Sequence, residues 1–149
     1  MEKRFTLNLF YMGLIAALIG VVTTGFVFHT SFMKQVRNDV ENEGHLIAAA
    51  YDDLDSPDEL QKFASSDLRI TLIAPSGTVL YESAADASKM ENHLNRPEVQ
   101  EALAAGTGYD KRSSDTIGTE EYYYAIKVSD GNILRVSISA GSMFNTFES

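Results

Sequence analysis

Side chains that could hold a charged ligand fall at two places in this sequence. At the first, His93 and Arg96 immediately precede residues 97–105, which have the composition of a short helix. A helix N-terminus carries partial positive charge, so an imidazole and a guanidinium beside it can hold an anion. Alternatively, Arg96 pairs with an acid such as Glu98 and His93 only caps the loop. Because histidine titrates near neutral pH, His93 could also make this region sensitive to pH.

The second place is the C-terminal part of the chain, where apolar and polar residues alternate. Tyr122 and Tyr124 share one face of such a segment, either as core or as aromatic walls of a ligand site. Arg135 stands between Leu134 and Val136, so it points either to solvent or into a pocket. The candidate ligand-binding residues are therefore His93, Arg96, Tyr122, Tyr124 and Arg135.

The composition excludes several kinds of chemistry. The chain has no cysteine, which excludes disulfides, thiol nucleophiles and cysteine-ligated metals. Its net charge of −9 disfavours nucleic acid as a partner, because phosphate backbones repel an acidic protein. The acids lack the spacing of metal ligands, so we expect a solvated acidic surface rather than a divalent-cation patch. No nucleophile-elbow, metal-protease or phosphate-loop motif is present, so we expect neither an enzyme nor a bound cofactor.

The longest uncharged stretch begins near the N-terminus and includes Leu9 to Phe28. A helix of this length spans about 30 Å, the thickness of the hydrocarbon core of a bilayer. A cleaved signal peptide is the alternative, but the run exceeds the apolar region of such peptides and no small-x-small cleavage site follows it. We therefore predict one transmembrane helix over residues 9–29. Within it, Ala16 and Gly20 form a small-xxx-small pair that would let two helices approach each other.

The basic residues at the start of the chain predict its orientation. Lys3 and Arg4 are expected to keep residues 1–8 in the cytoplasm. Residues 30–149 would then be extracytoplasmic, and the protein would be located in the cell membrane with the lipid bilayer as its surroundings.

Residues 30–66 are expected to form membrane-proximal helices. Met33, Val36 and Val40 fall at three- and four-residue steps on one stripe of a long helix. We predict that this stripe contacts a second copy of the chain in a homodimer and transmits movement to the membrane. A second, short helix should begin at Pro57.

Residues 67–139 have the pattern of an α+β domain. A turn at Pro75-Ser76-Gly77 separates two β-branched runs, which predicts a hairpin. A helix over 97–105 should end at Gly106, and further strands come after it. The sequence predicts a five-stranded antiparallel sheet with helices packed on it. Residues 140–149 would begin a return to the membrane. The expected strands are 69–74, 78–82, 108–116, 121–128 and 132–139.

Three segments, residues 69–83, 90–106 and 122–138, resemble the extracytoplasmic part of phosphate-regulon-type sensor histidine kinases of Gram-positive bacteria. The middle segment carries the most specific motif, Asn92-His93 followed by Arg96-Pro97-Glu98-Val99. The resemblance implies a PAS-like (PDC or Cache) sensor domain of a two-component system, preceded by one transmembrane helix. It covers only the input half, truncated or encoded alone, because the phosphoacceptor and ATP-binding domains of such kinases are absent from the sequence.

The cue is not identified by the sequence, and two further functions fit the same pattern. A docking module would bind a membrane or cell-wall partner and would have no small-molecule ligand. An input domain of a chemoreceptor or cyclase would share the fold and differ only in the output domain attached to it.

Overall fold

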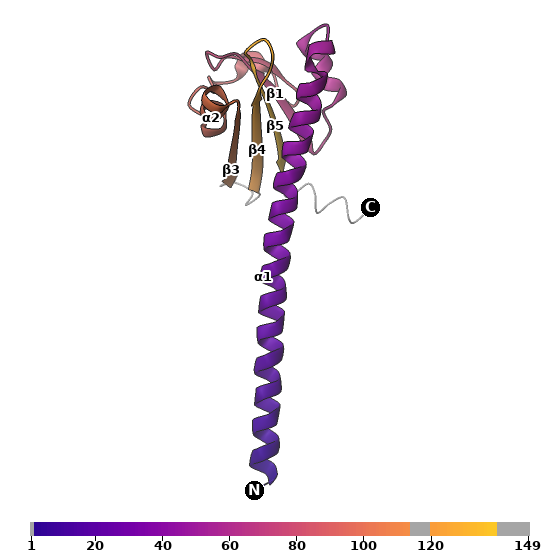
Figure 1. The fold of residues 1–149 in the computed structure, drawn as a ribbon, viewed down its shortest axis with the longest axis vertical. Helices are drawn as coiled ribbons and strands as arrows, with labels where there is room; N and C mark the ends of the chain where they lie inside the picture. Colours follow the sequence, from indigo (N-terminus) through magenta and orange to yellow (C-terminus); the bar gives the residue numbers. More distant parts are fainter. Residues whose placement is uncertain (1, 114–119, 140–149) are drawn as a thin grey trace. The chain divides into compact units, whose positions relative to one another are not determined.

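The computed structural model describes residues 2–113 and 120–139 of the chain. The chain divides into two compact units, Met1–Gln35 and Val36–Ser149. One long helix, α1 (Glu2–Ala50), contributes to both units (Figure 1).

The first unit is the apolar part of α1, whose large side chains from Phe5 to Phe28 are exposed. This is the one helix in the described part of the chain that is long and apolar enough to cross a membrane, with a mean hydropathy of 2.1 over its most apolar window. The Thr23 hydroxyl donates to the Ile19 carbonyl at 2.8 Å, so this polar group is satisfied within the helix, as hydrocarbon surroundings require. This segment therefore has the length and composition that a membrane-spanning helix needs, as the sequence predicted.

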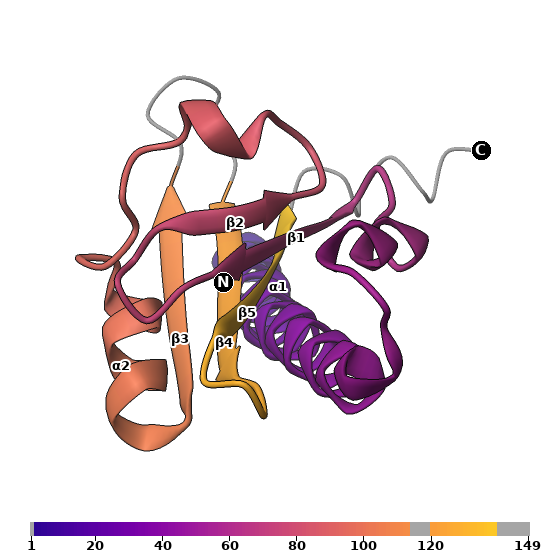
Figure 2. The ribbon, with the colours of Figure 1, turned by 90° about the horizontal axis from the view of Figure 1, so that it is seen from above.

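The second unit is built on a five-stranded antiparallel sheet in the order β2-β1-β5-β4-β3 (Figure 2). The α+β fold with a long N-terminal helix and a short second helix is therefore confirmed. The strands are β1 (Leu68–Ile73), β2 (Val79–Glu82), β3 (Thr107–Ser113), β4 (Glu120–Lys127) and β5 (Ile133–Ser139).

The helices of this unit end close to their predicted bounds. The second α-helix, α2 (Pro97–Ala105), is terminated by Gly106, whose φ of +91° suits glycine and whose N–H donates to the Ala102 carbonyl at 2.9 Å. Residues 114–116 of the third predicted strand and the predicted return segment 140–149 lie outside the described residues. Short 3-10 helices follow α1 and β2: η1 (Tyr51–Asp53), η2 (Pro57–Lys62) and η3 (Ala87–Lys89).

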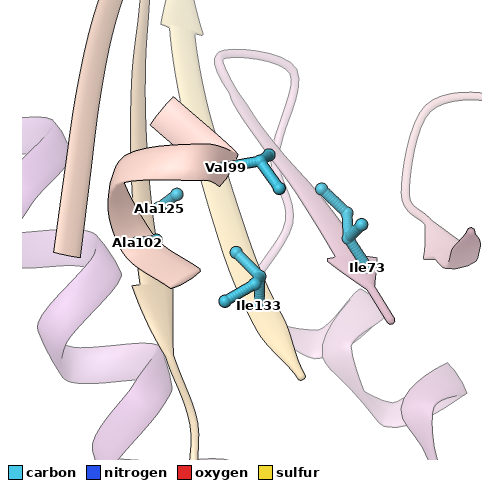
Figure 3. Packing of buried hydrophobic residues seen from close by; sticks show 5 residues of the cluster. All are labelled: Ile73, Val99, Ala102, Ala125 and Ile133. Atoms are coloured by element: carbon cyan, nitrogen blue, oxygen red, sulfur yellow. The ribbon is translucent and has the colours of Figure 1, made fainter. Parts of the chain in front are cut away.

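The sheet buries both of its faces. On one face, the backbone of α1 at Gly44 approaches Tyr124 and Val136 so closely that a Cβ there would lie 2.5 Å from Tyr124 Cδ1. On the other face, α2 packs over an apolar cluster (Figure 3). Alternation along the strands therefore assigns each side chain to an α1 side or an α2 side of the sheet. The cluster under α2 consists of Ile73, Val99, Ala102, Ala125 and Ile133.

Candidate ligand site and buried charge network

The α2 side of the sheet carries charged side chains that are shielded from water. Glu98, in the first turn of α2, is 0% exposed, and its Oε1 accepts hydrogen bonds from Arg112 Nη2 on β3 and, at 3.3 Å, from Arg135 Nη1 on β5. Arg135 is 3% exposed, and its Nη2 donates to Thr71 Oγ1 on β1 at 3.0 Å. One carboxylate thus ties α2 to two strands of the sheet, and Arg135 extends the connection to a third.

The network continues toward the edge formed by β2. The Thr71 hydroxyl donates to Glu82 Oε2 at 2.9 Å, and Arg69 Nε donates to Glu82 Oε1 at 2.6 Å. Arg112 Cζ also lies 4.0 Å from the centre of the Tyr123 ring, a cation–π distance. Charges removed from water are tolerated when they are paired in this way.

The sequence left open whether Arg135 points to solvent or into the domain, and in the structure its side chain is buried inside the domain. It does not point to solvent, and Glu98 and Thr71 already accept hydrogen bonds from its guanidinium. Burial lowers the pKa of Arg135 from its ordinary value, and the charge of Glu98 acts in the opposite direction. Two buried atoms here have no partner among the described residues: Arg135 Nε and Glu98 Oε2.

A hollow of about 350 Å³ opens beside the start of α2, and both His93 and Arg96 line it. His93 is 6% exposed, and its Nδ1 has no hydrogen-bond partner among the described residues. Its backbone is fixed on both sides, because its N–H donates to the Gly77 carbonyl at 2.8 Å and its carbonyl accepts from the Arg96 N–H at 3.0 Å. The loop residues that complete the lining are Ala85, Asp86, Lys89, Met90 and Glu91.

The environment of His93 favours its neutral form. Burial is the largest cause that lowers its pKa, followed by the charges of Arg135 and Arg96. A hydrogen bond to the backbone of Glu91 and the charge of Glu98 act in the opposite direction, but the net shift of the pKa is downward.

Arg96 is half-buried at the N-cap of α2, and no ion pair joins it to any acid in the described part of the chain. The pairing with Glu98 that the sequence offered as an alternative is made instead by Arg112 and Arg135. At the rim of the hollow, Lys89 Nζ lies 3.2 Å from Asp86 Oδ2.

The two predicted tyrosines lie on the opposite face of the sheet. Tyr122 and Tyr124 are buried on the α1 side, where the Tyr124 hydroxyl forms a hydrogen bond of 3.0 Å with His45 Nε2. Of the five candidate residues, the structure thus brings His93, Arg96 and Arg135 to the α2 side and separates both tyrosines from them. Sequence reasoning missed Glu98, Arg112 and Thr71 as members of a network. Alternation orders the residues within each strand, but only the pairing of the strands brings Thr71, Arg112 and Arg135 to one face, so the sequence alone carried no signal for the network.

The residues predicted for dimer contact and transmission divide between the two units. Val36 and Val40 are fully buried, because the domain of the same chain covers them. They are core residues in this arrangement, and a dimer contact through them would need α1 to leave its place. Ala16 and Gly20 are exposed on α1 and Met33 is half-buried, and their roles stay predictions.

Comparison with known proteins identifies only the fold of this chain. No protein-family model and no curated protein matches the chain. The YkuI protein of Bacillus subtilis, which has an EAL domain and was crystallised with its substrate c-di-GMP and calcium, matches with a TM-score of 0.52 and 14% identity, over 76% of this chain and 35% of YkuI. The extracellular domain of rpHK1S-Z16, a protein assigned as a histidine kinase, matches with a TM-score of 0.39 and 20% identity, over 68% of this chain and 39% of that one. The chain therefore spans well under half of either neighbour, and what it shares with YkuI is the fold.

Proposed function

We propose that this chain is the extracytoplasmic sensory input domain of a membrane-bound two-component histidine kinase, with a PAS-like domain outside the cell and residues 1–8 in the cytoplasm. The observation that carries the proposal is the course of α1. The helix that is apolar enough to cross a membrane continues to Ala50, and its later residues, including Ile47, are buried in the domain core.

Sensing in this proposal is a change in preference between two arrangements of the domain. A cue that binds one arrangement better raises its population, and only that difference in affinity shifts the balance. Since α1 packs directly on the sheet at Gly44 and Tyr124, any rearrangement of the sheet changes the surface on which α1 rests. In a homodimer, the α1 helices of the two copies would then shift relative to each other.

A docking module without a small-molecule ligand is the second candidate. It is favoured by one observation, namely that carboxylates inside the domain already pair with both guanidinium groups: Arg135 pairs with Glu98, and Arg112 pairs with Glu98 and Asp110. Neither guanidinium is then available to an external anion, and the cue would be a protein or cell-wall surface. Thermal-shift measurements on the full chain in detergent, against a panel of small anions, metabolites and metals, separate the two candidates. Ligand binding raises the melting temperature by mass action, whereas no shift across the panel favours docking.

The proposed orientation can be tested with single cysteines, because the chain has none of its own. Leu46→Cys places a thiol on a side chain that is 66% exposed on α1, and Phe5→Cys places one in the segment proposed to be cytoplasmic. A membrane-impermeant maleimide added to intact cells should label the first variant alone, and permeabilised cells should show both. Labelling of the Phe5→Cys variant alone in intact cells would contradict the extracytoplasmic placement.

The signalling role requires an output. We would join residues 1–149 to the second membrane helix and kinase core of a receptor with a known reporter, and compare Gly44→Leu with Asn42→Leu. Gly44 meets Tyr124 and Val136, whereas Asn42 is exposed on the same helix. We expect the first substitution to change kinase output and the second to leave it near the unsubstituted level. Equal outputs from both variants would remove the support for coupling through α1.

A further inference from the structure

A groove of about 350 Å³ opens in the domain at the point where α1 ends. One wall belongs to residues 51–57, which follow α1, and the other belongs to residues 129–132, in the turn between β4 and β5. Leu72 of β1 and Leu80 of β2 line it between these walls. Segments that are far apart in the sequence thus form one continuous surface.

The groove has an apolar floor that is only partly covered. Leu72 is fully buried, whereas Leu80 is 47% exposed although its side chain is large and apolar. Leu80 belongs to β2, at the edge of the sheet, where a partner can reach it from outside the domain. Leu54 and Pro57 extend the apolar lining. Such a surface gives an apolar side chain of a partner a place to leave water.

The rim of the groove is negatively charged. Asp52, Asp55 and Asp130 line it, together with no described lysine, arginine or histidine. None of the three carboxylates forms an ion pair with a basic side chain in the described part of the chain. Asp52 accepts a hydrogen bond from the Ser129 hydroxyl, and Asp130 accepts one from the Tyr51 hydroxyl at 2.9 Å. These neutral donors hold two of the carboxylates in place without cancelling their charge.

The negative charge acts on Tyr51, which belongs to one wall and is bonded to the other. Burial is the largest cause that raises the pKa of its phenol, and the bond to Asp130 raises it further, against an opposing bond with Asn132. The charges of Asp130 and Asp52 add to this upward shift of the pKa. Like charges fixed around one groove favour a cation that enters between them.

Charge and lining together exclude most classes of partner. A second copy of this chain, with its net charge of −9, is repelled, and so are nucleic acids and anionic lipid surfaces. A small polyamine would neutralise the rim but leave the apolar floor in water. A peptide segment that carries an apolar side chain between two cations matches both the floor and the rim.

We propose that this groove docks a basic segment of a partner protein, with an apolar side chain against Leu80 and flanking arginines or lysines against the three carboxylates of the rim. The inference names the kind of cue for the proposed sensory function and therefore rests on it. The cue would act at the end of α1, because Tyr51 directly follows that helix. A docked segment would change the contact that joins this end of α1 to Asp130 in the turn before β5.

The probe for this proposal is the blocked tripeptide acetyl-Arg-Leu-Arg-amide, which has two positive charges, one apolar side chain and no carboxylate. It is added to the full chain in an uncharged detergent, with the leucine methyl groups labelled for NMR and the Leu80 signals assigned with Leu80→Ala. We expect the Leu80 signals to shift and to saturate as the peptide is added. Salt should weaken the response, because the carboxylates of the rim are exposed to solvent.

Matched variants separate the charge of the rim from charge elsewhere, with binding measured by the anisotropy of the same peptide carrying a fluorophore. Asp52→Asn, Asp55→Asn and Asp130→Asn each keep a hydrogen-bond acceptor and should each weaken binding by up to about fivefold, the range of an exposed ion pair. The triple variant should lose about tenfold or more. Glu91→Gln removes one negative charge at an exposed position outside the groove and should change binding little.

A second set of changes tests the apolar floor. Leu80→Ala should weaken binding about fivefold or more, as expected for an apolar anchor of an interface. Leu94→Ala is the matched control, since Leu94 is 38% exposed and lies outside the groove. The peptide acetyl-Arg-Gly-Arg-amide should bind about fivefold more weakly than the probe, and acetyl-Glu-Leu-Glu-amide should not bind. All the substituted side chains are exposed, so we expect every variant to fold, which its melting curve verifies.

Three results would overturn the proposal: no shift of the Leu80 signals with the probe, equal binding by the triple Asp→Asn variant, or binding of spermidine or acetyl-Arg-Gly-Arg-amide as tight as that of the probe. None of these results affects the cysteine-labelling and chimaera experiments. Failure of the docking groove and failure of the sensory role can therefore be told apart.

Discussion

Substitution of Glu98 by glutamine tests whether the buried network holds α2 on the sheet. The change keeps the size of the side chain and removes the negative charge that pairs with both Arg112 and Arg135. Arg135, at 3% exposure, is then left as a buried cation without its carboxylate partner. Breaking a buried pair on one side costs about 3–5 kcal/mol, and we expect the lower end because the amide oxygen still accepts a hydrogen bond.

In a domain of this size, a loss of about 3 kcal/mol lowers the melting temperature by about 12–24 °C. Thermal unfolding of the full chain in detergent, followed by circular dichroism, gives the value directly. The matched control is Glu59→Gln, which removes the exposed pair with Lys62 at 2.8 Å and should cost at most about 1 kcal/mol.

A double variant distinguishes the cost of leaving Arg135 unpaired from a general destabilisation of the fold. If Arg135 is destabilising because it is unpaired, Glu98→Gln combined with Arg135→Gln should cost less than the sum of the two single changes. The reasoning is refuted if Glu98→Gln shifts the melting temperature no more than Glu59→Gln, or if the two network changes add without interaction.

Three further expectations come from single residues. Gly44→Ala should destabilise the domain by about 1–3 kcal/mol in chemical denaturation, although alanine favours helices, because its Cβ would lie 2.5 Å from Tyr124. Gly106→Ala should cost about 1–2 kcal/mol from its φ of +91° alone, since nothing else lies within 4 Å of the added Cβ. Burial and the hydrogen bond to Glu121 raise the pKa of Tyr123 to about 12 from 10.0. The folded state therefore favours the protonated phenol, so this stabilisation is complete below pH 10 and is lost as the pH rises toward 12. An ultraviolet titration should show one phenol that deprotonates at a pH of about 12. Tyr123→Phe should remove this step from the titration and the corresponding loss of stability at alkaline pH.

Features that depend on a few neighbouring residues could be predicted from the sequence. The turns after β1 and β4 and the end of α2 each contain a glycine at positive φ, Gly77, Gly131 and Gly106. Each of these glycines follows a segment whose apolar periodicity indicates a strand or a helix. The neighbouring sequence was therefore sufficient to predict the turn or the helix end. Alternation also placed Tyr122 and Tyr124 correctly on a common face.

Features that depend on strand order could not be predicted in the same way. The pairing of Glu98 with Arg135 requires β5 to lie at the centre of the sheet and α2 to cross that face, which no local pattern specifies. Gly44 shows the same limit. Its helix propensity marks it as a weak point of α1, whereas the structure gives it a packing role, because any side chain there would meet Tyr124 and Val136.

Within the domain, α1 is joined to the sheet by contacts that a small displacement would break. Arg37 Cζ on α1 lies 4.3 Å from the centre of the Tyr109 ring on β3. In η1, which directly follows α1, the Tyr51 hydroxyl donates to Asp130 Oδ2 at 2.9 Å in the turn before β5. Signalling shifts of helices are typically about 1–2 Å. A displacement of that size exceeds the tolerance of a hydrogen bond, so sliding α1 would exchange one set of contacts for another rather than stretch them.

The bond between His45 and Tyr124 offers the sharpest test of this idea, because it can be removed without changing the packing. Tyr124→Phe deletes only the hydroxyl that lies 3.0 Å from His45 Nε2. If that bond holds α1 in one of two arrangements, its loss of about 1 kcal/mol changes their ratio about fivefold, and basal output of the kinase chimaera should change accordingly. Tyr122→Phe is the matched control, since its hydroxyl donates to Glu120 on the same strand. An unchanged output from Tyr124→Phe, or the same change from Tyr122→Phe, would mean that the position of α1 is not set by this contact.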